Sequence, residues 1–112
     1  MSNIDYAIAK LKDAIIADYK KRPLIGNNPP EFYEKMDREF AEGLSASVGK
    51  KYIKIISNDS VWGFVVNVED DKKFKYGDIL KAAGWATPAR NKARGNVFEK
   101  YSVAWTGPHY LK

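Results

Sequence analysis

Apolar positions near the start of the chain repeat with the spacing of a helix. Between residues 3 and 22 they fall three or four positions apart, so they share one helix face. Pro23 prevents this helix from continuing. After a loop over residues 23–30, a second stripe repeats every four residues across 30–46 and predicts a second amphipathic helix. Two such helices joined by a short loop are expected to pack antiparallel.

Around Gly49 the apolar pattern changes to the alternation of a strand. Residues 52–56 and 61–68 are rich in β-branched and aromatic side chains, and the link 57–60 has the composition of a turn. This pattern predicts an antiparallel hairpin. Its second strand is expected to pack on the helices through one face, which carries Trp62, Phe64, Val66 and Val68.

The last third of the chain has shorter signals. Asp78 can cap a helix over 79–83, Thr87 can cap one over 88–94, and alternation over 97–105 predicts a last strand before an irregular tail. The order predicts an α+β fold. Two N-terminal amphipathic helices pack on a small, about three-stranded antiparallel sheet, with a short helical insertion before the last strand. At 112 residues, we expect one domain over 1–112.

Composition excludes several classes of protein. Fifteen aromatic residues, with many Ile and Val, can bury a core and argue against disorder. The absence of Cys excludes a disulfide framework, a thiolate zinc site and a Cys nucleophile. No apolar run approaches the ~18 residues that span a bilayer, and the N-terminus has no basic and then apolar leader. We therefore expect a cytoplasmic protein without a membrane segment.

Catalytic motifs are missing from the sequence. The single His, His109, cannot form a His-rich metal site, and the chain has no Walker A, GxGxxG, GxSxG or HExxH pattern. Residues 69–73 have the composition of a solvated link. We predict no enzyme activity, no cofactor and no metal site, although a pair of carboxylates brought together by the fold stays open.

One segment has a distinct charge pattern within a chain of net charge +5. No acidic residue lies between Asp78 and Glu99, a stretch that holds four cations. If 88–94 is helical, Arg90 and Arg94 share a face, and the N–H groups at 87–90 form a helix N-terminus that favours anions. The sequence therefore predicts a phosphate-binding site made by Lys81, Thr87, Arg90, Lys92 and Arg94.

Two aromatic residues near this segment, Tyr76 and Trp85, could stack on a base or anchor a partner protein. For Trp85, however, the sequence favours a place in the core over a stacking role. The cations can equally form a solvated face that pairs with residues 69–71 or Glu99. An acidic partner protein is a further alternative, and a three-stranded sheet leaves edges that a second copy could cover in a homodimer.

The run GDILKAAGWATPARNKARGNVF at residues 77–98, with Trp105-Thr-Gly-Pro108, resembles a stretch of small, uncharacterised proteins of tailed bacteriophages. The resemblance implies a phage origin and a host-cell cytoplasm, and it attaches no chemistry. Small phage proteins often bind host or phage macromolecules. The sequence thus favours a non-enzymatic protein that contacts nucleic-acid phosphates through the basic 79–98 segment, with a modulator of a host or phage protein as the alternative.

Overall fold

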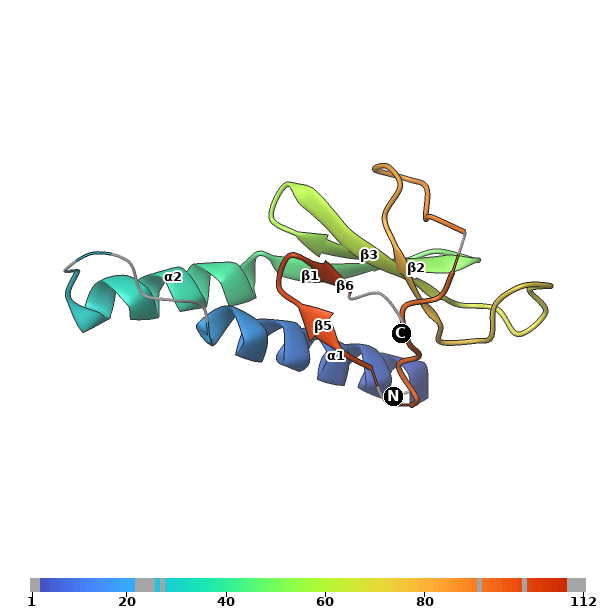
Figure 1. Cartoon of the computed structure of the whole chain (residues 1–112), viewed down its shortest axis with the longest axis horizontal. Coiled ribbons are helices and arrows are strands. Elements are labelled where there is room, and N and C mark those ends of the chain that lie inside the picture. The colour runs from blue at the N-terminus through green and yellow to red at the C-terminus, as the bar shows by residue number, and fades with distance from the viewer. Residues whose placement is uncertain (1–2, 22–25, 27, 91, 100, 109–112) are drawn as a thin grey trace.

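The computed structural model describes residues 3–21, 26, 28–90, 92–99 and 101–108 (Figure 1). Helices α1 (Asn3–Lys20) and α2 (Pro30–Glu42) precede strands β1 (Leu44–Val48), β2 (Tyr52–Ser57), β3 (Ser60–Val66), β4 (Ile79–Lys81), β5 (Val103–Ala104) and β6 (Gly107–Pro108). Strands β1 to β4 form one antiparallel sheet in sequence order, and β5 pairs with β6. The α+β fold with N-terminal helices is confirmed.

Helix α1 lies across one face of the four-stranded sheet (Figure 1). Leu11 and Ile15 are fully buried and pack with Ile53 and Ile55 of β2 and Ile79 of β4. Burying such a side chain contributes about 1.5–3 kcal/mol. The predicted helix face is therefore the face that joins α1 to the sheet.

Helix α2 ends earlier than predicted. Its last residue is Glu42, and the Gly43 N–H closes the helix on the Glu39 carbonyl at 3.0 Å. The chain then enters β1, although the sequence predicted helix to residue 46. The alternation of small side chains after Gly43 pairs with β2, and this tertiary pairing overrides a helical spacing that Leu44 happens to continue.

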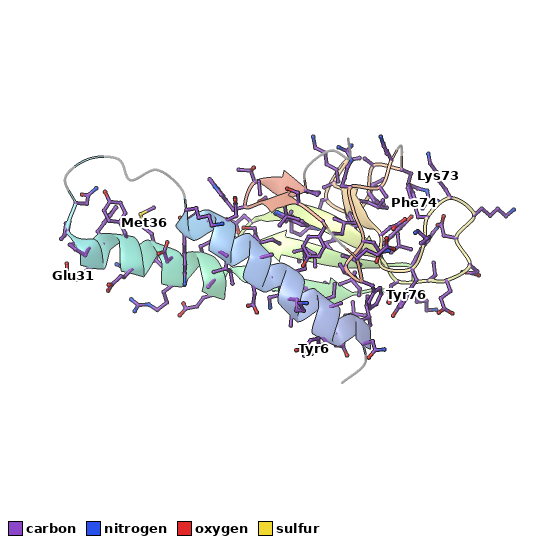
Figure 2. All side chains as sticks on the ribbon, turned by 60° about the horizontal axis from the view of Figure 1, so that its bottom comes forward. Tyr6, Glu31, Met36, Lys73, Phe74 and Tyr76 are labelled. Atoms are coloured by element: carbon purple, nitrogen blue, oxygen red, sulfur yellow. The ribbon has the colours of Figure 1, made fainter. Side chains whose placement is uncertain are left out.

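The two helices do not pack antiparallel along their lengths. They meet through the last turn of α1, where Tyr19 stacks on Phe40 with ring centroids 4.0 Å apart. Figure 2 shows Glu31 and Met36 on the part of α2 that extends away from the sheet. Phe32, on the same part, is 44% exposed. The helix therefore lengthens the molecule to 51 Å along its long axis.

A β-bulge changes which side chains of β3 face α1. Opposite β3, Ile55 pairs with Gly63 whereas Ile56 pairs with Val61, so Trp62 is the extra residue. Trp62 packs in the cluster under α1, and Phe64 packs in the cluster on the opposite sheet face. The prediction that Trp62, Phe64 and Val66 share a face is wrong, because an inserted residue breaks the two-residue period.

The described residues of 79–95 form no helices; the chain runs out along β4, turns, and comes back beside it. Ile79–Lys81 is β4, Ala82 bridges to Pro88, and the Ala83 and Gly84 N–H groups donate to the Thr87 carbonyl. The N–H groups of Ile79 and Arg94 donate to the carbonyls of Gly95 and Ile79 respectively, so residues 94–95 run beside β4. The helical prediction for 79–83 and 88–94 is wrong.

Asp78 explains part of that error, because its carboxylate is not a helix cap. It accepts hydrogen bonds from the Asn96 amide and the Lys75 N–H, both at 2.9 Å. The predicted strand over 97–105 shortens to β5, and part of the tail predicted to be irregular forms β6. His109 lies outside the described residues.

Candidate nucleic-acid interface

Two neighbouring hollows lie beside the sheet face opposite α1. The larger, about 480 Å³, is lined by Lys50, Lys51, Val68, Asp70, Asp71, Lys72 and Arg90. The smaller, about 260 Å³, is lined by Ser47, Gly49, Lys50, Lys51, Tyr52, Lys54, Phe64 and Ala86. Lys50 and Lys51 line both hollows, so the two hollows adjoin, and together they are called here the basic groove.

An ion pair fixes one wall of the basic groove. The Arg90 Nη2 atom lies 3.0 Å from both carboxylate oxygens of Asp71, and Nη1 donates to the Tyr52 hydroxyl. The Asp71 carboxylate also accepts the N–H groups of Lys73 at 2.8 Å and Phe74 at 3.0 Å. Arg90 further lies over the Phe74 ring, 4.9 Å from its centroid. These contacts tie the 71–74 and 90 segments to β2.

The same contacts set the charge states. The hydrogen bond from Arg90, followed by the two backbone N–H groups, holds the pKa of Asp71 well below its usual range. The hydrogen bond to Asp71 in turn raises the pKa of Arg90. Asp71 was read from the sequence as part of a solvated link, yet its side chain is 2% exposed. The Arg90 guanidinium is thus bound to Asp71 and Tyr52 and joins two parts of the groove wall.

Lysines supply the accessible positive charge of the groove. Lys50, Lys51 and Lys72 are exposed, and the Lys51 ammonium lies 3.8 Å from Asp71. Lys73 is also exposed and donates to the Arg90 carbonyl beside the groove. Figure 2 shows Lys73 on the loop next to Phe74. With Lys54 and Arg90, five cations line the groove and Lys73 lies beside it, against the two carboxylates of Asp70 and Asp71.

Trp85 lies at the margin of this surface. Its side chain is 58% exposed, so the prediction that it fills the core is wrong. The Lys54 ammonium lies over the indole, 4.7 Å from the ring centroid, and Ala86 lines the groove next to it. Lysine and tryptophan thus form one composite surface with a flat apolar face and a positive charge.

Tyr76 lies elsewhere. Its ring packs against Phe98 at 5.5 Å and against the core cluster under α1, so it is half-buried on the other side of the sheet. Figure 2 shows Tyr76 set apart from Lys73 and Phe74. The structure therefore does not bring Tyr76 and Trp85 together.

The five residues of the predicted phosphate site, all described, do not converge. Lys81 follows Leu80 in β4; Leu80 packs beside the groove, so alternation directs Lys81 to the α1 side. Thr87 is exposed but starts no helix. Arg94 is 2% exposed, and its Nε donates to the Lys92 carbonyl at 3.2 Å, with Lys92 exposed above it. Of the five, Arg90 lines the groove.

The sequence analysis missed the lysines that line the groove. Their signal is two doublets, Lys50-Lys51 and Lys72-Lys73, with Lys54 placed two residues after Tyr52 on one face of β2. The fold brings these separate positions together with residue 90, and neither doublet stands out in the sequence as the acid-free 79–98 segment does.

Two further properties concern the described part of the chain. Among those residues, no group of three or more His, Cys, Asp or Glu is placed to hold a metal ion. No helix within the described ranges is long and apolar enough to cross a membrane.

No family model, curated protein or solved structure matches this chain.

Proposed function

We propose that the protein binds nucleic acid through the basic groove. The observation that carries the proposal is the convergence of Lys50, Lys51, Lys54 and Lys72 with exposed Trp85 on one surface. Lysine ammonium groups bind phosphates as point charges, and this term supplies most non-specific affinity for nucleic acids. In this proposal, residues 50–54 and 72–73 contact the phosphates, and the 79–98 segment contributes Trp85 and the groove wall at Arg90.

The charge balance supports an anionic ligand. Asp71 is neutralised by Arg90 and by nearby Lys51, which leaves Asp70 as the remaining anion among the lining side chains. The exposed lysines therefore face the ligand with a local excess of positive charge. Such a groove attracts a polyanion at low ionic strength and loses it as salt rises.

Trp85 favours a single strand over a duplex. A base can stack on an exposed indole only when it is not stacked within a duplex, and such stacking contributes about 1–3 kcal/mol per base. Lys54, 4.7 Å from the ring centroid, is placed to meet the phosphate next to that base. Proteins that bind single strands without sequence preference combine an aromatic ring for the bases with cations for the backbone, as Trp85 and Lys54 do in this proposal.

Fluorescence anisotropy of labelled oligo-dT and of a duplex of equal length tests this function. Lys50→Gln/Lys51→Gln is expected to weaken binding and to reduce the salt slope for the single strand by about 1.4, since each lost phosphate contact accounts for about 0.7. The matched control, Lys20→Gln/Lys21→Gln, removes the same charge from the end of α1 and should bind as the wild type does. If both variants lose affinity for the oligonucleotide equally, net charge alone explains the loss, and the basic groove is not the binding site.

A second candidate function is binding to a host or phage protein. The part of α2 that projects away from the sheet favours it. The helix has five acidic and two basic side chains, and Phe32 stands 44% exposed beside Tyr33. A protein partner there would carry a basic surface. Phe32→Ser should then abolish the complex and leave oligonucleotide binding unchanged, whereas the Lys50→Gln/Lys51→Gln variant should do the reverse.

A further inference from the structure

Strand β1 is an edge of the four-stranded sheet, and within the described ranges no other strand pairs with its outer side. Four of its five residues are exposed, and Val48 is 68% exposed. The strand reads Leu-Ser-Ala-Ser-Val, without the charged residue, proline or bulge that usually blocks an edge. In a chain with 29% charged residues, this uncharged edge is suited to pairing with another strand.

The hydrogen bonds at the two ends of β1 show which backbone groups point outward. The Gly43 carbonyl accepts the Asn58 N–H at 2.8 Å, and the Gly49 N–H donates to the Tyr52 carbonyl at 2.9 Å. Bonding direction alternates along an antiparallel strand, so odd-numbered residues from 43 to 49 bond toward β2. The N–H and C=O groups of Leu44, Ala46 and Val48 therefore point away from the sheet.

We propose that a second copy of the chain pairs along β1, antiparallel and centred on Ala46, to make a two-fold dimer. In this register Ala46 faces its own equivalent, and Leu44 faces Val48 of the second copy at both ends. All three pairs bring outward-pointing groups together, which gives about six inter-strand hydrogen bonds. The exposed Val48 side chain comes beside Leu44 on the same face, so apolar area is also buried.

Charge supports the same register. In the register that sets Leu44 against Val48, the end of α2, with Glu42, comes next to the β1–β2 turn of the second copy, with Lys50, twice in the dimer. Glu42 ends the acidic helix α2, and Lys50 is exposed in the β1–β2 turn. Opposite charges at both ends favour this alignment over a shifted register, although the overall charge of +5 repels the two copies.

The dimer goes beyond the proposed function and does not depend on it. A two-fold axis midway between the two Ala46 residues and normal to the sheet extends it to eight strands and keeps equivalent faces on the same side. Both basic grooves then open in one direction, with the Lys51 residues of the two copies at opposite ends of the paired strands. A single polyanion could follow both grooves, and this would add avidity without a new contact.

Sedimentation velocity over a range of protein concentrations, with amide hydrogen exchange by NMR, tests the dimer. The expected result is a dimer at high concentration, with Leu44, Ala46 and Val48 amides protected together with those of Ser45 and Ser47. On dilution the three outward amides should lose protection while the two serine amides keep it. A monomer at all concentrations, or a dimer with those three amides unprotected, overturns the proposal.

Variants test the edge and its register separately. Ala46→Pro removes an outward N–H and should yield a monomer with a wild-type circular dichroism spectrum; exchange on the unmodified chain decides the question if this variant unfolds. Glu42→Lys and Lys50→Glu should each weaken the dimer several-fold, and the double swap should restore it. Glu31→Lys, an equal charge change at the far end of α2, should have no effect. A double swap that fails to restore the dimer overturns the register.

Discussion

Arg90 and Asp71 meet with Nη2 3.0 Å from each carboxylate oxygen, and this contact joins two segments nineteen residues apart over the same edge of the basic groove. The contact changes the meaning of the basic 79–98 segment. Its most central cation, Arg90, bonds to another part of the chain. The exposed lysines of the groove come from the β1–β2 turn and from the loop after β3.

Replacing Arg90 should therefore act first on the stability of the fold. Any loss of nucleic-acid binding should be a consequence of that loss of stability. In Arg90→Gln, the Asp71 side chain, 2% exposed, loses its principal partner, and the Tyr52 hydroxyl loses its donor. The melting temperature, followed by circular dichroism, should fall further than in Lys72→Gln, where an exposed lysine of the same groove is lost. Equal melting temperatures in the two variants would show that Arg90 is not structural.

The depressed pKa of Asp71 predicts an acid-dependent loss of stability. The unfolded chain takes up the proton near the ordinary value of 3.8, whereas the folded chain resists it. The contribution is therefore complete above about pH 5 and declines as pH falls through 3.8 and below. Urea unfolding across this pH range should show the difference between wild type and Asp71→Asn shrinking toward acid. A difference that stays constant would contradict the shift.

Trp85→Ala should leave the fold intact and weaken single-strand binding. The side chain is 58% exposed, so stability should change by no more than about 0.5 kcal/mol. The loss of one stacked base corresponds to about 1–3 kcal/mol in affinity for oligo-dT. Tyr76→Phe is the control, because Tyr76 lies on the other side of the sheet. Unchanged affinity in Trp85→Ala would remove stacking from the proposed function.

Leu11→Ala should be strongly destabilising. Leu11 is fully buried between α1 and the sheet, and truncation of such a residue costs about 2–5 kcal/mol through lost burial and the cavity left behind. Tyr6→Ala, on the same helix with 65% exposure, should cost far less. Chemical denaturation of both variants checks the assignment of the core, and similar losses would contradict it.

The sequence predicted the parts of the fold in which local pattern and tertiary packing agree. The apolar stripe of α1 and the hairpin of β2 and β3 are of this kind. Prediction failed where a few tertiary hydrogen bonds decide the conformation. Asp78 has the chemistry of a helix cap but bonds to Asn96, and the Trp62 bulge reverses a face without any marked change in composition.

The candidate site shows the same limit. A run without acidic residues was visible along the chain, but a surface depends on which segments fold together. Arg94 contributed to the predicted charge cluster and is buried, whereas Lys54 was hidden within a strand and lies beside Trp85. The pairing of β2, β3 and β4 decides which cations are buried and which lie at the groove. This pairing depends on the register of the strands, which composition does not show.

The position of α2 also bears on how the molecule opens. Of the thirteen residues of this helix, Phe40 is buried, and its contact with Tyr19 lies near the helix end. The first turns therefore gain little from tertiary packing and depend on the limited stability of a short helix in water. Chymotrypsin, which cuts after aromatic residues, should reach the Phe32-Tyr33 pair while the sheet stays folded. Limited digestion should therefore cut the chain within α2, and the fragment that contains α1 should stay bound to the sheet through its buried face.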